Sequence, residues 1–138
     1  MSRTLQDKKT VGELPLFRSI SIFMTHVIPI ILNINKDIKV TLGYTIIKDS
    51  VSSLKMLRKA YQEKRVDKKY ACVNELYGII SDIEILFKLM FELKFISLKQ
   101  QANVSIEIGD IMMQLNGWKK SIENVIENNN NKSSDLNS

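Results

Sequence analysis

Apolar residues recur every three or four positions along four stretches of the chain, and this spacing is typical of one buried helical face. The first predicted helix covers residues 15–34 and begins with Pro15, a residue suited to the first helical turn. Pro29 lies inside it and lacks the N–H that would bond to the carbonyl of Thr25, so we expect a bend there. Its predicted core face consists of Phe17, Ile20, Met24, Val27, Ile31 and Ile34.

Three further helices are predicted in the same way. The helix over 39–64 follows a short loop at 35–37, with Thr41 or Asp37 near its start, and its predicted core face is Val40, Tyr44, Ile47, Val51, Leu54, Leu57 and Tyr61. The next begins after Asp67, as N-cap, and ends near Phe95; its face is Val73, Leu76, Ile80, Ile83, Phe87 and Met90. Ser97 caps the last, which runs to about Ile126 with Val104, Ile108, Ile111, Leu115, Trp118, Ile122 and Val125 on its face.

Four helices of this length joined by short loops predict an all-α protein with an antiparallel up-down-up-down four-helix bundle. Residues 14–126 form the bundle in this prediction, and residues 1–13 form a flexible N-terminal arm. Residues 127–138 are rich in Asn and Ser and have too little apolar surface to fold, so they are expected to be a disordered tail.

The helix over 68–95 carries more apolar residues than one buried face needs. Ile79, Leu86 and Leu93 form a second row at seven-residue spacing beside the core face. A deeply buried central helix explains this surplus, and so does an interface with another subunit, because large exposed apolar patches mark interfaces.

Residues able to do chemistry are few. The chain has one cysteine, Cys72, and one histidine, His26, so it can form no internal disulfide and offers no Cys/His metal cluster. The acidic residues do not combine with histidines in a di-iron pattern, and no phosphate-binding glycine loop is present. We therefore expect no catalytic residues, no metal and no cofactor, and a protein that is not an enzyme.

The chain is expected to be cytoplasmic. Its first residues lack the apolar core of a signal peptide, and the single cysteine fits a reducing compartment. The apolar run from Ile20 to Ile34 is interrupted by polar residues and is shorter than the roughly 20 residues that span a bilayer. No membrane partner is therefore expected.

Charge is distributed unevenly. The chain carries a net charge of +5, yet residues 36–69 alone hold ten Lys and Arg against four Asp and Glu, so the rest of the chain is slightly acidic. No acidic residue lies between Ser50 and Gln62. Most charge runs are simply solvated faces, but unbalanced positive charge on one face also attracts polyanions. The predicted nucleic-acid-binding residues are Lys48, Lys55, Arg58, Lys59, Lys64, Arg65, Lys68 and Lys69.

Several short motifs resemble one family. They are Leu14-Pro15-Leu16-Phe17, the mid-helix Val27-Ile28-Pro29, Val40-Thr41-Leu42-Gly43, Ile96-Ser97-Leu98-Lys99-Gln100 and the run from Asp110 to Ser121 that contains Gly117-Trp118. In order and spacing, over about residues 14–121, they resemble the accessory variability determinant proteins of diversity-generating retroelements. These belong to a four-helix-bundle superfamily that includes proteins encoded in 23S ribosomal RNA intervening sequences.

The resemblance implies a homopentamer with a basic surface that binds the retroelement's reverse transcriptase and its template RNA or the derived DNA. Such a protein supports mutagenic reverse transcription without catalysing it. Gly117 is expected to let its helix approach a neighbour closely, and Trp118 to fill the end of the bundle.

Some positions depart from the family pattern. Met112 and Met113 stand where glycine and arginine are common, and the loop after the first helix lacks the usual proline. Residues 51–55 do not match the motif of the intervening-sequence branch, which favours the retroelement branch. The alternative is an oligomeric four-helix-bundle adaptor whose basic face binds an acidic protein.

Overall fold

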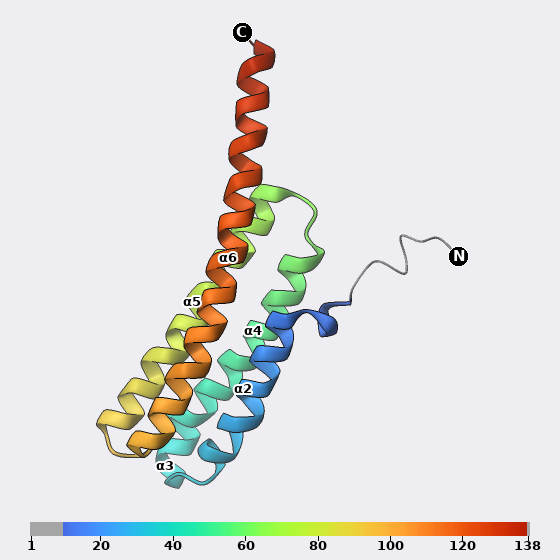
Figure 1. The fold of residues 1–138 in the computed structure, drawn as a ribbon. Coiled ribbons are helices and arrows are strands. Elements are labelled where there is room, and N and C mark those ends of the chain that lie inside the picture. Colours follow the sequence, from blue (N-terminus) through green and yellow to red (C-terminus); the bar gives the residue numbers. More distant parts are fainter. Residues whose placement is uncertain (1–9, 138) are drawn as a thin grey trace.

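The computed structural model describes residues 10–137, which are almost entirely helical and contain no strand. Four long helices, α2, α4, α5 and α6, lie side by side (Figure 1). Within the described residues the elements are η1 (Val11–Glu13), α2 (Pro15–Leu32), α3 (Lys36–Ile38), the π-helix η2 (Lys39–Gly43), α4 (Tyr44–Gln62), α5 (Val66–Glu92) and α6 (Leu98–Asn137). The predicted all-helical class with four long helices is therefore confirmed, whereas residues 1–9 of the predicted N-terminal arm lie outside the described part.

Each long helix contacts two others, because α4 packs on α2 and α5, and α6 packs on α5 and α2. The centre holds an edge-to-face pair of Phe23 on α2 and Phe87 on α5, whose ring centroids are 6.0 Å apart. The turn between α4 and α5 lies at the end of the molecule from which α6 projects (Figure 1).

The predicted core faces of α5 and α6 are largely confirmed. All six predicted residues of α5 are buried, as are Val104, Ile108, Ile111, Leu115 and Ile122 of α6. Trp118 is only half-buried and Val125 is exposed, since α6 has begun to leave the other helices there. On α2, Ile20, Val27 and Ile31 are buried as expected, together with Leu16 and Phe23, which the pattern missed.

The predicted core face of α4 is only partly correct: Leu57 is buried as predicted, and Ile47 and Leu54 pack partly against the core. Val40, Tyr44 and Val51 are exposed, whereas the buried side of this segment consists of Gly43, Ile46, Ser50, Ser53, Leu57 and Ala60. The two buried hydroxyls are satisfied within the helix, since Ser50 Oγ donates to the Ile46 carbonyl at 2.8 Å and Ser53 Oγ to the Ser50 carbonyl at 2.6 Å. The buried side of this segment therefore combines small residues with Ile46 and Leu57, while Tyr44 and Val51 lie outside.

The helix ends combine correct and incorrect predictions. Ser97 caps α6, because its Oγ accepts the Gln100 N–H at 3.1 Å while Gln100 Oε1 accepts the Ser97 N–H at 2.9 Å. The N-cap of α5 is Arg65 and not Asp67, which lies in the first turn. Asn35, and not Thr41, caps the segment before α4, where its Oδ1 accepts the Asp37 N–H.

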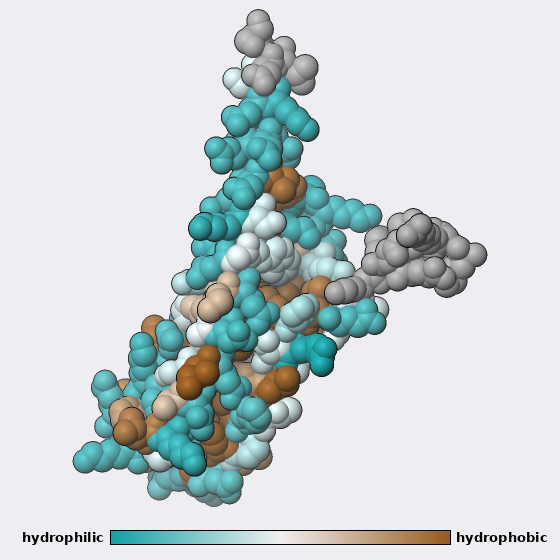
Figure 2. Space-filling view, viewed as in Figure 1, coloured by the Kyte–Doolittle hydropathy of each residue, from teal (hydrophilic) through white to brown (hydrophobic). Residues whose placement is uncertain are grey.

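The expected disordered tail differs from the structure, in which α6 continues to Asn137. Beyond Gly117 the chain contains no glycine or proline that would stop a helix. The projecting part of α6 is hydrophilic and stands clear of the other helices (Figure 2). It therefore lengthens the helix without adding to the core.

By length and composition alone, α2 is apolar enough to cross a membrane, and it is the one such helix among the described residues. Core helices of soluble proteins pass the same test, so this property alone does not indicate a membrane span. Only Leu16, Ile20, Phe23, Val27 and Ile31 of α2 are buried, so much of this apolar helix lies on the surface.

Candidate nucleic-acid interface

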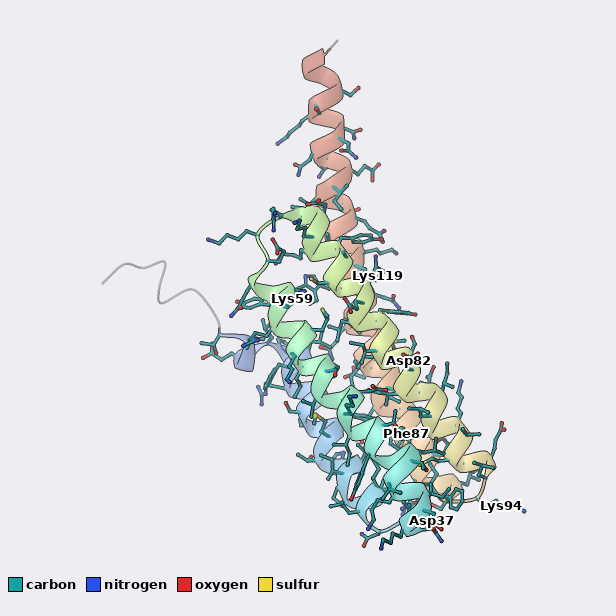
Figure 3. The ribbon with its side chains drawn as sticks, turned by 180° about the vertical axis from the view of Figure 1, so that it is seen from behind. Asp37, Lys59, Asp82, Phe87, Lys94 and Lys119 are labelled. Carbon is teal, nitrogen blue, oxygen red and sulfur yellow. The ribbon has the colours of Figure 1, made fainter. Side chains whose placement is uncertain are left out.

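The basic residues of α4 lie on its outer side. Lys48, Lys55 and Lys59 are all exposed and are spaced by seven and four residues, so they follow one line along the helix. That line is opposite the buried side formed by Ile46, Ser50 and Leu57. Lys59 lies near the end of α4 that leads into the α4–α5 turn (Figure 3).

The turn between α4 and α5 and the first turn of α5 carry further positive charges. Lys64, Arg65 and Lys68 are exposed there. The Glu63 carboxylate accepts the Arg65 backbone N–H at 3.1 Å and its Nε–H at 3.3 Å, and these hydrogen bonds hold the pKa of Glu63 below its usual range. Glu63 therefore remains ionised and partly offsets the charge of Arg65.

We call seven of the eight predicted residues the basic surface: Lys48, Lys55, Arg58, Lys59, Lys64, Arg65 and Lys68. Within the described part of the chain, Arg65 is the only one of them that forms an ion pair with a carboxylate. Exposed positive charges without ion pairs attract an incoming anion, although Lys48 interacts with the Asp49 carboxylate and Lys68 with that of Glu63. The basic surface is thus available to a polyanion.

Two carboxylates lie close to the basic surface, in the groove between α4 and α5. A cavity of about 560 Å³ there is lined by Lys55, Arg58 and Lys59 together with Asp49 and Glu75. Burial raises the pKa of Asp49, repulsion from Asp82 raises it further, and Lys48 opposes both effects. The groove is therefore less positive than the outer side of α4.

Lys69, the eighth predicted residue, does not belong to the basic surface, because its side chain points towards Trp118 on α6. It is half-buried, its Nζ donates to the Tyr61 carbonyl at 3.3 Å, and it lies 6.0 Å from the centroid of the Trp118 ring. It lines a separate cavity of about 370 Å³ with Trp118 and Tyr61. Charge spacing alone could not reveal this, because Lys69 adjoins Lys68 in sequence while pointing towards a different helix.

The residues predicted for an oligomer interface are partly covered. Ile79 lines the groove between α4 and α5, and Ile79 and Leu86 are half-buried against the core. Leu93, one residue past the end of α5, is 49% exposed. As an interface, this row remains a prediction.

A different apolar surface was missed by the sequence pattern, because its α4 residues were assigned to the core. We call it the α2–α4 face. A cavity of about 440 Å³ between the two helices is lined by Met24, Ile28 and Leu54. The α2–α4 face comprises Met24, Ile28 and Leu32 of α2 and Tyr44, Ile47, Val51 and Leu54 of α4, all exposed or half-buried.

The residues with catalytic potential lie apart from one another. His26 Nδ1 is 2.7 Å from Glu107 Oε1 on the surface, where it joins α2 to α6. Cys72 is buried in α5. In the described part of the chain, no three His, Cys, Asp or Glu residues are grouped as metal ligands.

Comparisons of the chain with protein-family models, with curated proteins and with solved structures gave no match. The family resemblance therefore rests on the sequence motifs alone.

Proposed function

We propose that this protein is a non-catalytic, oligomeric accessory protein that binds nucleic acid in the cytoplasm. In this proposal it associates with the reverse transcriptase of a diversity-generating retroelement and with its template RNA or the derived DNA, and it supports mutagenic reverse transcription. The observation that carries the proposal is the basic surface, in which Lys48, Lys55 and Lys59 follow the outer side of α4 without ion pairs among the described residues. Lys and Arg side chains bind phosphates by releasing condensed counterions, and this binding needs no base recognition.

The proposal includes an antiparallel up-down-up-down four-helix bundle with a bend in α2 at Pro29. Each long helix contacting two others, and the short connections between them, support this arrangement. Pro29 has no N–H for the carbonyl of Thr25, which supports the bend. The bundle holds α4 rigidly, so that its outer side presents a fixed line of charge.

We further propose a homo-oligomer, and the number five comes from the sequence resemblance alone. The α2–α4 face supports self-association, because Leu32, Tyr44 and Val51 are apolar or aromatic and are between 39% and 50% exposed. In an oligomer, several copies of the basic surface would act on one nucleic acid and strengthen binding by avidity.

The decisive experiment reverses charge on the basic surface. The triple variant Lys55→Glu, Arg58→Glu, Lys59→Glu should lose binding of labelled RNA and DNA at low salt while keeping its helical circular dichroism. A matched control, Lys36→Glu, Lys88→Glu, Lys99→Glu, makes the same change in net charge on other elements and should retain binding. Equal loss in both variants, or full binding by the first, would contradict the proposal.

The alternative is an oligomeric adaptor that binds an acidic protein, and the exposed α2–α4 face also favours it. An adaptor would retain its protein partner after nuclease treatment and would show no salt-dependent binding of RNA. A nucleic-acid-binding protein would instead lose affinity steeply as salt rises, with a slope that reflects the number of phosphates contacted.

A further inference from the structure

A cavity of about 370 Å³ opens between the start of α2, the end of α4, the start of α5 and α6. These parts lie at the end of the molecule that carries the α4–α5 turn (Figure 1). Its lining residues are Leu14, Pro15, Leu16, Leu57, Tyr61, Lys69, Gln114 and Trp118. Its size is in the range of small-ligand pockets, so it can hold a planar ring.

The lining combines aromatic surface with one positive charge. Tyr61 and Trp118 are half-buried, and aliphatic side chains make up most of the remainder. Among the described residues that line it, Lys69 is the only charged one and none carries a carboxylate. The α4–α5 groove, in contrast, contains Asp49 and Glu75, so this cavity is the better environment for an anionic ligand with an aromatic group.

The Lys69 side chain already occupies a position over the indole. Its Nζ is 6.0 Å from the Trp118 ring centroid and donates a hydrogen bond to the Tyr61 carbonyl. A cation near an aromatic face can exchange that contact for a phosphate, because a charge-assisted hydrogen bond is stronger. Lys69 therefore can bind the backbone of a nucleotide whose base contacts Trp118.

The cavity is joined along the chain to the basic surface. Lys69 follows Lys68 directly, and Tyr61 precedes the turn that carries Lys64 and Arg65. Because Leu57 lines the cavity on the side of α4 opposite the lysine line, a strand would pass from the basic surface to the cavity around the α4–α5 turn, past Lys64 and Arg65. Duplex bases are stacked inside the helix and cannot enter a pocket, whereas the bases of a single strand can.

We propose that this cavity takes one unpaired base of single-stranded RNA or DNA, stacked on Trp118, with Lys69 on the adjoining phosphate. The inference rests on the proposed function and specifies which form of nucleic acid that surface prefers. The inference also explains why Lys69 differs from the other predicted basic residues. Lys69 would bind the phosphate beside the base in the cavity, whereas the other residues lie on the outer surface.

Trp118 is the only tryptophan in the chain, so its fluorescence reports on the cavity in the unmodified protein. Three probes of equal length would be titrated: an oligo(dT) strand, a strand of abasic deoxyribose phosphates and a DNA duplex. Anisotropy of a labelled strand measures total binding. We expect all three to bind through charge, and only oligo(dT) to quench Trp118.

A variant provides a second measurement. Trp118→Leu should weaken oligo(dT) binding roughly 10- to 100-fold, the range expected for one lost base stack, and should leave the affinity for the abasic strand unchanged. Phe91→Leu removes a half-buried aromatic ring far along α5 and serves as the matched control. If Trp118→Leu does not fold, the fluorescence titration of the unmodified protein still decides the question.

The outcomes separate the two proposals. If oligo(dT) and the abasic strand bind and quench equally, or bind without quenching, the base pocket is wrong and the basic surface stands. If none of the strands binds, both proposals fail. If Trp118→Leu impairs only the capture of a protein partner, the cavity binds an apolar side chain and not a base.

Discussion

Gly43 lies so close to Ile31 that a Cβ added to the glycine would stand 2.7 Å from Ile31 Cγ2. Both residues are buried, and Ile31 is fully so. Its γ-methyl group branches directly from Cβ and cannot move away without a change of rotamer. The contact therefore fixes how closely the segment before α4 approaches α2.

We predict that Gly43→Ala destabilises the protein by about 1–3 kcal/mol, the usual cost of overpacking a core. Urea unfolding followed by circular dichroism measures this difference. Gly78→Ala is the matched control, because a Cβ at Gly78 meets nothing within 4 Å. That helical substitution should stabilise the protein by about 0.5–1 kcal/mol. Similar effects of both substitutions would show that the close approach is not important for stability.

The glycines also illustrate what the sequence could and could not predict. Gly117 was expected to let α6 approach a neighbour, but it is exposed and a Cβ there meets nothing within 4 Å. Gly43 has that role instead. A glycine in a sequence indicates conformational freedom or close packing, and only the position of neighbouring helices decides between them.

The same dependence on neighbouring helices explains why the core face of α5 was predicted correctly and that of α4 only in part. Large apolar residues occupy the buried side of α5, so periodicity identifies its core face. The buried side of α4 includes Ser50, Ser53 and Ala60, which a hydrophobic pattern does not select. Tyr44, Ile47, Val51 and Leu54 instead form part of the α2–α4 face, which depends on how the neighbouring helices pack.

Within the candidate site, spacing on α4 correctly put Lys48, Lys55 and Lys59 along one exposed line. It could not separate Lys69 from Lys68, since that depends on which side of α5 packs against α6. The carboxylates of Asp49 and Glu75 also join the α4–α5 groove through packing between helices.

A second prediction concerns Asp49, whose pKa is raised above its ordinary value of 3.8 by burial and by the charge of Asp82. The folded state therefore holds this proton more tightly than the unfolded state. The resulting stability is complete below pH 3.8 and is lost as the pH rises through the folded pKa. At neutral pH the ionised carboxylate is consequently unfavourable.

Asp49→Asn should therefore stabilise the protein at pH 7 and should not do so at pH 3. Chemical unfolding at the two pH values measures the difference. Asp82→Asn provides the control, because removing its charge should lower the pKa of Asp49 in an NMR titration. An equal gain from Asp49→Asn at both pH values would mean that hydrogen bonding, and not charge, determines the effect.

A third prediction concerns the projecting part of α6. Among the residues of α6 whose burial is described, Ile122 is the last buried one and Ile126 the last that packs against the core. A chain that ends after residue 126 should unfold at the same urea concentration as the full chain. It should lose helical ellipticity, because the helix continues from a segment whose nucleation is already complete. A drop in the unfolding midpoint would show that residues 127–137 contact the core or another subunit.

A fourth prediction distinguishes the two apolar surfaces available for self-association. On the α2–α4 face, Tyr44 and Val51 are exposed although they are large and apolar or aromatic, whereas Ile79 and Leu86 on α5 are already half-covered by packing. Burial of exposed apolar area drives association at about 25 cal/mol per Å², and Tyr44 and Val51 have such area to bury. We expect Tyr44→Lys with Val51→Lys to reduce the oligomer to a smaller species in light scattering.

The matched control for this pair is Ile85→Lys with Leu89→Lys, which adds the same two charges at exposed apolar positions of α5. It should leave the mass unchanged, because these residues belong neither to the α2–α4 face nor to the predicted row. Leu93→Lys tests the predicted row Ile79, Leu86 and Leu93 at Leu93, which is its most exposed residue. If Leu93→Lys alone dissociates the oligomer, the interface lies on α5. If the unmodified protein is a monomer at tens of micromolar, self-association through either surface is excluded.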